Sequence, residues 1–295
     1  MPPGYLAGKH LHALFLTVVD SVDSALATQL HGQTSNKAFT ISPLQIEGRG
    51  DRSRQGLAAH LLLAEHRRAV PAGASCWFRV SLLDEQLFSQ LAQLWLNIHP
   101  QKPWHLGPAD LFISRILGTA NPNQPWANFA SYGSLYGQAS EDETQIDLTF
   151  CTPTAFRQQK FDTSLPTPEA VFGSLLRRWN QYADCPFEPD ILQPIFPSFF
   201  DIQTQIVMEA RSKFIGCTGH VTYRIMGDVA PETIKQINTL ADFSLYAGVG
   251  RKTPMGMGMV RRLAPKSRSG SPQSTPQSTP QSTPRPKPRK KQLAA

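Results

Sequence analysis

A glycine-rich stretch near the end of the chain, GVGRKTPMGMGMV at 248–260, has residue types that can bind an anion. Glycine allows the backbone to approach a ligand closely and to turn successive N–H groups towards a negative charge. The basic pair Arg251 and Lys252 lies within this stretch. These residues predict phosphate binding, and the alternative interpretation is a glycine-rich turn between a helix and the last strand.

The stretch does not match the known nucleotide-binding loops. Thr253 stands where a dinucleotide-binding loop needs its third glycine, and no Gly-Lys-Ser/Thr completes a P-loop. The sequence therefore argues against a mononucleotide or NAD pocket, and no cofactor is expected.

The cysteines and the apolar runs indicate the class of protein. Cys76, Cys151, Cys185 and Cys217 are far apart and form no C-x-x-C pair, so neither a zinc cluster nor a redox motif is predicted. No apolar run approaches the roughly 18 residues of a membrane span, and the first residues do not resemble a signal peptide. We expect a soluble, intracellular protein with no metal site.

The basic charge is concentrated in the last residues of the chain. The net charge is +7, and residues 264–295 hold seven Lys and Arg and no acidic residue. The preceding residues are therefore neutral overall, and the high pI alone says little about partners. The repeated Pro-Gln-Ser-Thr of the tail predicts disorder, as a solubilising tail or as a supplementary contact to nucleic acid.

The first half of the chain alternates between strand-like and helical patterns. Residues 11–19 form an apolar run that predicts a buried strand, and residues 24–31 predict a short helix. Further strands are predicted at 39–44, 76–82 and 111–117, and a helix at 83–95 with Ser81 and Asp84 as its capping box.

A second cycle begins with a strand at 146–151. The following helix has Thr167 as N-cap and Pro168 at its first position. Strands at 204–214 and 219–226, a helix opened by Pro231 and a last strand at 257–263 complete the pattern. The order predicts an α+β fold of two tandem ferredoxin-like (RRM-like, βαββαβ) domains, at 1–140 and 141–263, followed by the tail at 264–295.

Four segments carry a resemblance to a known family. They are HGQTSNKAFTISPL (31–44), FCTPTAFR (150–157) with LPTP and FGSLLRRWN (172–180) after it, GCTGHVTY (216–223), and the glycine-rich stretch. In this order and spacing the chain resembles the CRISPR repeat-processing endoribonucleases of the RAMP superfamily.

The resemblance implies a function. Such enzymes bind the hairpin of a CRISPR repeat and cut 3′ of its stem without a metal ion. The ribose 2′-oxygen attacks phosphorus and leaves a 2′,3′-cyclic phosphate, which requires a base, an acid and positive charge. His31 matches the catalytic histidine of the family and Lys37 its catalytic lysine.

The resemblance also implies RNA contacts. Gly248, Gly250, Arg251, Lys252, Gly256 and Gly258 are expected to border the RNA backbone, with Arg157, Arg177 and Arg178 as further candidates. Trp77, Trp95 and Trp179 are interpreted as packing residues. His220 is a distant catalytic candidate that is more simply a strand histidine.

The chain departs from the family at one position. Some members use a tyrosine about fifteen residues before the histidine, where this chain has Leu16. Catalysis would then rest on His31 and Lys37, or use Tyr5, Thr34 or Ser35.

Two functions therefore remain open. The first is a prokaryotic, cytoplasmic nuclease that stays on its mature crRNA as a subunit of a Cascade-type complex, and the second is a RAMP subunit that holds crRNA without cutting it. A two-domain metabolic enzyme is disfavoured because no carboxylate cluster or cofactor loop is present. The sequence predicts no membrane partner and leaves the oligomeric state open.

Overall fold

The computed structural model describes residues 1–33, 37–47, 60–208 and 213–263. The predicted tail and the alternative catalytic residues Thr34 and Ser35 lie outside the described residues. All described residues belong to one compact unit. The predicted boundary at residue 140 therefore stays a prediction.

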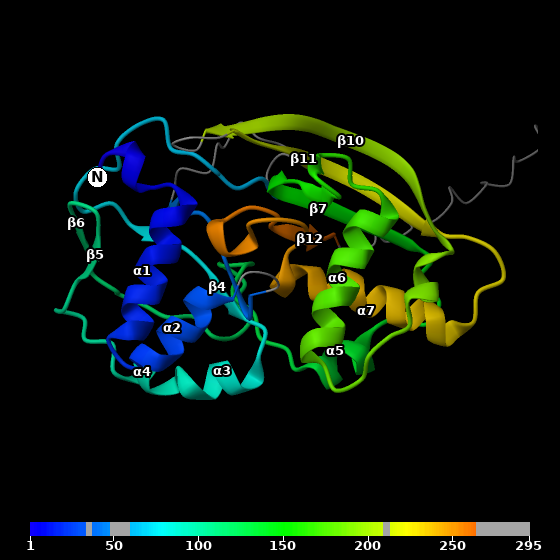
Figure 1. The fold of residues 1–295 in the computed structure, drawn as a ribbon, viewed down its shortest axis with the longest axis horizontal. Helices are drawn as coiled ribbons and strands as arrows, with labels where there is room; N and C mark the ends of the chain where they lie inside the picture. The colour runs from blue at the N-terminus through cyan, green and yellow to red at the C-terminus, as the bar shows by residue number, and fades with distance from the viewer. Residues whose placement is uncertain (34–36, 48–59, 209–212, 264–295) are drawn as a thin grey trace, which may run out of the picture. The chain divides into compact units, whose positions relative to one another are not determined.

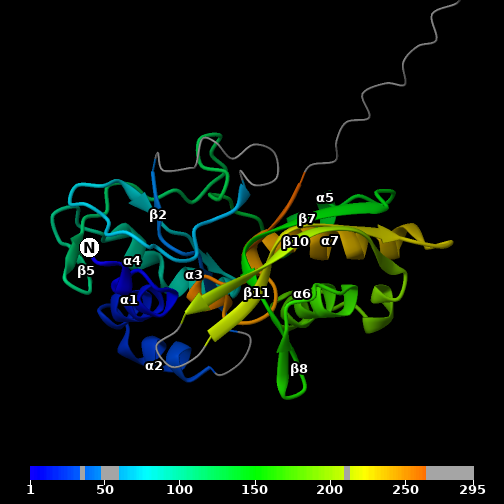
Figure 2. The same cartoon turned by 90° about the horizontal axis from the view of Figure 1, so that it is seen from above.

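One four-stranded antiparallel sheet contains most of the extended residues (Figures 1 and 2). The strands of this sheet and the two α-helices between them are, in chain order, β7 (Gln145–Thr154), α6 (Pro168–Tyr182), β10 (Ile195–Met208), β11 (Lys213–Ile225), α7 (Pro231–Ala247) and β12 (Val260–Arg262). The strand order is β10-β11-β7-β12 with every pair antiparallel. The sheet strands and the two helices follow one another in the predicted βαββαβ order, with a further hairpin of β8 (Phe156–Gln158) and β9 (Phe161–Thr163) between β7 and α6. The strand predicted at 204–214 had the wrong bounds, because β10 ends at Met208 and β11 begins at Lys213.

Alternating side chains of the sheet and one face of each helix build the main core. Ile146, Leu148 and Phe150 of β7 are fully buried, as is Trp179 of α6. The start of α6 is the predicted one, because the Thr167 hydroxyl accepts a hydrogen bond from the Ala170 N–H and Pro168 follows it. Burial of Trp179 agrees with its interpretation as a packing residue.

The first half of the chain contains helices and short strand pairs. Its elements are α1 (Gly8–Asp20), α2 (Ser24–Gly32), β1 (Phe39–Ile41), β2 (Gln45–Ile46), β3 (Cys76–Trp77), β4 (Val80–Leu82), α3 (Glu85–Gln90), α4 (Ala92–Leu96), β5 (Trp104–Leu106), β6 (Ala109–Leu111) and α5 (Tyr132–Gln138). The pairs are β1 with β4, β2 with β3, and β5 with β6. Helix α2 and strand β1 were predicted; the tandem arrangement of two ferredoxin-like domains remains a prediction.

The prediction of a strand at 11–19 was wrong. These residues lie in helix α1, whose buried side chains include Leu11, Leu14, Phe15 and Val18. Their spacing of three and four residues is helical, and a run of this length fits a helix better than a strand. Because nearly every residue of the run is apolar, the helical spacing of the buried positions was not visible in the sequence.

Two smaller predictions also need correction. The helix expected at 83–95 is divided at Leu91 into α3 and α4, and its N-cap is Asp84, which accepts a hydrogen bond from the Gln86 N–H. Ser81 lies in β4 instead. Of the strand expected at 111–117, only Leu111 is in a strand, at the end of β6.

Candidate functional site

His31 and Lys37 meet at the C-terminal end of α2. The helix begins at Asp23, whose carboxylate accepts a hydrogen bond from the Leu26 N–H, and His31 lies in its last turn. The Lys37 ammonium donates to the carbonyl oxygens of Leu30 at 2.5 Å and His31 at 3.2 Å. Lysine thus stabilises the carbonyl end of α2 and brings its charge beside the histidine. Partial burial lowers the pKa of Lys37.

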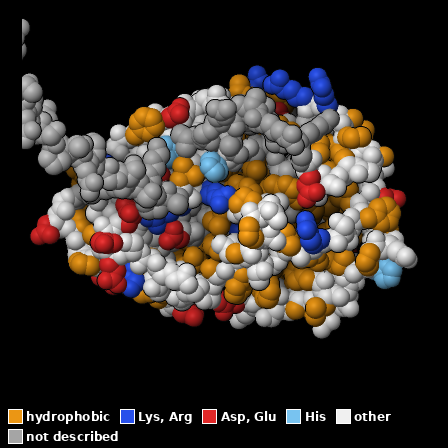
Figure 3. Space-filling model, turned by 180° about the vertical axis from the view of Figure 1, so that it is seen from behind, with side chains coloured by type: hydrophobic (Ala, Val, Ile, Leu, Met, Phe, Trp, Pro, Cys, Tyr) orange, Lys and Arg blue, Asp and Glu red, His pale blue; other side chains and the backbone are white. Residues whose placement is uncertain are grey.

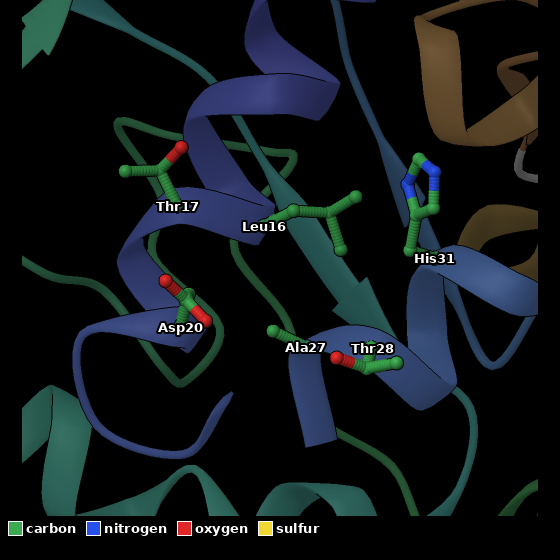
Figure 4. A pocket seen from close by; sticks show the side chains of 6 residues that line it. All are labelled: Leu16, Thr17, Asp20, Ala27, Thr28 and His31. Atoms are coloured by element: carbon green, nitrogen blue, oxygen red, sulfur yellow. The ribbon is translucent and has the colours of Figure 1, made fainter. Parts of the chain in front are cut away.

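The His31 side chain is exposed and lines a shallow pocket between α1 and α2 (Figure 4). The pocket has a volume of about 300 Å³, and its other lining residues are Leu16, Thr17, Asp20, Ala27 and Thr28. Leu16 extends from α1 on the side facing His31. Its aliphatic side chain cannot transfer a proton. Tyr5, the described alternative, packs against His10 with 5.6 Å between ring centroids.

A second histidine, which the sequence analysis missed, lies behind this pair. His12 of α1 is 9% exposed, stacks on Phe39 of β1 and has no hydrogen-bond partner for Nε2 among the described residues. Burial, followed by the positive charges of Lys37 and His31, lowers the pKa of His12 to about 4. Three basic side chains from α1, α2 and the start of β1 therefore converge. A helical interpretation of 11–19 would have placed His12 on the buried face.

The lowered pKa of His12 should make the free energy of unfolding depend on pH in the acid range. Above pH 6.5 its imidazole is neutral whether the protein is folded or unfolded. Between pH 6.5 and 4 only the unfolded state binds the proton, so the free energy of unfolding falls as pH decreases, by on the order of 3 kcal/mol in all. Urea unfolding at several pH values should show a smaller decrease for His12→Phe than for the wild type. Equal decreases would show that folded His12 takes up the proton freely.

The glycine-rich stretch is a loop between α7 and β12, and it contacts the first half of the chain through the short 3₁₀ helix η4 (Thr253–Met255). This helix contacts α1 and β1. Gly248, Gly256 and Gly258 are buried inside the loop, which disfavours the expectation that they border RNA; that expectation stays a prediction. A side chain at Gly258, which has φ +67°, would overlap the carbonyl oxygen of Val249. Internal packing therefore requires glycine there, while Gly250, Arg251 and Lys252 are partly exposed.

Three side chains capture the last carbonyl groups of α7, where the loop begins. Arg79 donates to the carbonyl oxygen of Leu245, Thr40 to that of Tyr246 at 3.0 Å, and Arg178 to that of Ala247. Thr40 lies in β1, close to Lys37. The clamp, as we call Thr40, Arg79 and Arg178, thus joins the segment with Lys37 to the start of the glycine loop.

Arg178, one of the predicted RNA contacts, is buried. It is 5% exposed, and besides Ala247 it donates to the Thr253 hydroxyl at 2.8 Å and to the Gly250 carbonyl at 3.4 Å. Its donors are used inside the protein, where they hold the loop, so its predicted contact with RNA stays a prediction that these buried bonds disfavour. Its position in α6 follows from the helical period, which places it on the buried face three residues after Leu175.

The other predicted contacts separate into two groups. Arg157 and Arg251 lie together at the edge of the loop, both beside Asp162. Arg177 is exposed on α6 and makes no hydrogen bond or ion pair with the described part of the loop. On the face turned away from the viewer in Figure 1, the Lys and Arg side chains visible among the described residues lie in separate places (Figure 3).

The described residues offer no cluster of His, Cys, Asp and Glu suited to a metal ion. His220 is buried in β11, where its Nε2 lies 3.3 Å from the carboxylate of Asp147 in β7, away from the residues around His31. No described helix is long and apolar enough to cross a membrane. The arrangement around His31 can transfer a proton and stabilise a negative charge through its side chains.

Two family models match most of the chain. The CRISPR Cas6 N-terminal domain matches residues 1–137, and CRISPR-associated endoribonuclease Cas6 matches residues 148–260. A Cas6 from Streptococcus thermophilus is 25% identical over 132 residues, which are 42% of this chain and 52% of that protein. A Cas6 from Mycobacterium tuberculosis is 29% identical over 138 residues, which are 44% of this chain and 43% of that protein. The chain thus spans about half the length of the curated relatives it matches.

Solved structures are similar over nearly the whole fold. A Cas6 product complex has a TM-score of 0.71 and 26% identity, covering 89% of this chain and 95% of that one. Thermus thermophilus Cas6 has a TM-score of 0.63 and 23% identity, with 89% and 93% covered. A RAMP protein described as binding different RNA substrates has a TM-score of 0.54 at 14% identity, with 90% and 93% covered, which shows a shared fold only.

Proposed function

Because this chain belongs to the CRISPR repeat-processing Cas6 family of the RAMP type, we propose that it cleaves CRISPR precursor RNA at the repeat. It binds the repeat hairpin and cuts 3′ of the stem by metal-independent attack of the ribose 2′-oxygen. The products are a 2′,3′-cyclic phosphate and a 5′-hydroxyl. The convergence of His31 and Lys37 at the end of α2 is the observation that carries this proposal.

The described side chains supply the parts of this reaction. His31 is exposed at the pocket, where it takes the proton from the 2′-hydroxyl and returns a proton to the leaving 5′-oxygen, while Lys37 stabilises the charge that develops on the phosphate. His12 stays neutral and buried behind them and positions Phe39 and the start of β1. Leu16 takes no part in proton transfer, so the reaction rests on fewer groups than in family members with a tyrosine there.

RNA binds along the exposed edge of the glycine loop. Arg251, Lys252 and Arg157 are at the surface of this region, and the clamp fixes the loop against β1. The loop also contacts α1, which lines the pocket with α2, through η4. The product hairpin stays bound, and the protein acts as a crRNA-carrying subunit of a Cascade-type complex in the prokaryotic cytoplasm.

A second candidate function is a RAMP subunit that holds crRNA without cutting it. Leu16 favours this function because it removes a possible proton donor from the pocket. The presence of His31 together with Lys37, whose ammonium donates to the His31 carbonyl oxygen, favours cleavage.

Incubation of the intact chain with its repeat RNA in EDTA distinguishes the two functions. We expect one cut at the base of the stem, with a 2′,3′-cyclic phosphate on the 5′ product. Tight binding without a cut would support the holding function. A cut that requires added Mg²⁺ would contradict the proposed chemistry.

Lys37→Met is expected to slow cleavage by about tenfold to a hundredfold, because the positive charge beside the scissile phosphate is lost. It also removes two hydrogen bonds to the end of α2, at a cost of about 1 kcal/mol in the free energy of unfolding. Single-turnover rates at saturating protein and urea unfolding separate these effects.

Lys9→Met is the matched control, because Lys9 is exposed on the neighbouring helix α1. It should leave both the rate and the stability unchanged. Lys37→Arg keeps the charge and should recover part of the rate. A Lys37→Met protein with the wild-type rate would remove Lys37 from the reaction.

A further inference from the structure

One carboxylate lies between two arginines at the edge of the glycine loop. Strands β8 (Phe156–Gln158) and β9 (Phe161–Thr163) form a hairpin in which Arg157 and Asp162 are direct cross-strand partners. Arg157 Nε lies 3.2 Å from Asp162 Oδ1, and Arg251 Nη1 bonds Asp162 Oδ2. Each oxygen of the carboxylate thus faces a different guanidinium group.

The backbone, rather than Asp162, brings the two arginines together. The Arg251 N–H donates to the carbonyl oxygen of Ala155 at 2.9 Å, directly before β8. Gly250 lies so close to the same carbonyl group that a side chain there would overlap it. Arg157 is held by its own bond to the Lys160 carbonyl oxygen at 2.7 Å. The backbone segments that carry the two arginines therefore stay side by side independently of the carboxylate.

The three side chains remain open to solvent. Exposed fractions are 47% for the side chain of Arg157 and 32% each for those of Asp162 and Arg251. Exposed ion pairs contribute little to stability, so folding gives little reason for this arrangement. Two positive charges against one negative charge leave the group positive.

A phosphate group, like a carboxylate, presents two oxygen atoms that accept hydrogen bonds from guanidinium N–H groups. We propose that Arg157 and Arg251 form a binding site for one RNA backbone phosphate, which Asp162 occupies in the free protein and leaves when RNA binds. This inference rests on the proposed function. Asp162 acts as an internal competitor that weakens binding of RNA that cannot engage the rest of the surface.

The test compares two variants of the intact chain that remove one negative charge each. Asp162→Asn frees the two arginines, whereas Asp242→Asn breaks the ion pair of Asp242 with Arg262 at 2.9 Å, elsewhere on the fold. Affinity for repeat RNA and for an unrelated single-stranded RNA is measured over a range of salt concentrations. We expect Asp162→Asn to bind both RNAs about threefold more tightly at low salt and to steepen the log-log salt slope by about 0.7, the value for one more phosphate contact.

The control and a second variant decide the outcome. Asp242→Asn should bind like the wild type, and adding Arg157→Met to Asp162→Asn should abolish the gain in affinity. Asp162→Asn with wild-type or weaker binding would overturn the inference, because Asp162 would then be holding the arginines in place. Arg157→Met alone should weaken binding, which tests the site even if Asp162→Asn folds poorly.

Failure of the proposed function would look different. A wild-type protein that neither prefers nor cuts the repeat RNA would contradict the proposed function. The gain of Asp162→Asn on unrelated RNA would still support the phosphate site. Normal repeat cleavage with no effect of Asp162→Asn would contradict the inference alone.

Discussion

His31→Ala is expected to reduce the single-turnover rate of repeat cleavage by 10²- to 10⁴-fold, the range for loss of a proton-transfer group. The side chain is exposed at the pocket, so its removal leaves no cavity and should change the free energy of unfolding by less than about 0.5 kcal/mol. Repeat RNA should bind with wild-type affinity within about twofold, since the basic edge of the loop is intact. The measurement is the cleavage rate at saturating protein in EDTA, with end-group analysis of any product.

His99→Ala is the matched control, because His99 is also exposed, follows α4 in the chain and does not line the pocket. It should cut at the wild-type rate. Residual cleavage by His31→Ala that disappears in the double variant with His12→Phe would give His12 a share in proton transfer. Full activity of His31→Ala would exclude the proposed mechanism.

Arg178→Met is expected to lower the free energy of unfolding by about 3 kcal/mol. The substitution leaves the carbonyl oxygen of Ala247 and the hydroxyl of Thr253 without the hydrogen bonds that Arg178 donates. A polar group that loses its hydrogen-bond partner in the protein interior destabilises the fold more than one exposed to water. Relief of the burial cost of the guanidinium group offsets part of this effect; burial lowers the pKa of Arg178 to about 10. Urea unfolding measures the change.

The glycine loop should also lose its fixed conformation in Arg178→Met. The Gly250 N–H still donates to the Ser174 hydroxyl at 3.0 Å, but the carbonyl oxygens of Ala247 and Gly250 each lose a donor. Affinity for repeat RNA at a temperature where the variant is folded is therefore expected to fall. The neighbouring Arg177→Met is the matched control, because Arg177 is exposed, and it should be stable within about 0.5 kcal/mol. Equal stability of the two variants would show that the buried contacts of Arg178 are unimportant.

Arg177 and Arg178 show which features of a side chain the helical period of the sequence can predict and which it cannot. The period of α6 assigns Arg178 to the buried face and Arg177 to the exposed one, but a charged side chain on the buried face was interpreted as a surface residue. Its partners lie 69 to 75 residues further along the chain, in α7 and the glycine loop. No local pattern identifies such partners.

The first helix was mispredicted for a related reason. Residues 11–19 are apolar at nearly every position, and both a buried strand and a buried helix satisfy such a run. Packing of α1 against α2 and the start of β1 selects the helix. Because the helix was missed, His12 was missed with it.

The sequence by itself determined the features that depend on neighbouring residues. These are the N-cap of α6 at Thr167, the βαββαβ order of the second half, the four segments of family resemblance, and the presence of His31 and Lys37 six residues apart. Each follows from short-range hydrogen bonding, from hydrophobic period, or from a motif contained in one stretch.

Only the tertiary structure decided which groups share a site. The Thr40 hydroxyl and the carbonyl oxygen of Tyr246 are 206 residues apart in the chain and 3.0 Å apart in space, and this contact places the glycine loop beside the segment with Lys37. The tertiary structure buries Gly256, Gly258 and Arg178 inside the protein, and the β8–β9 hairpin places Asp162 between two arginines. Side-chain roles of this kind depend on long-range contacts, whose energies are set by burial and distance in space and not by position in the sequence.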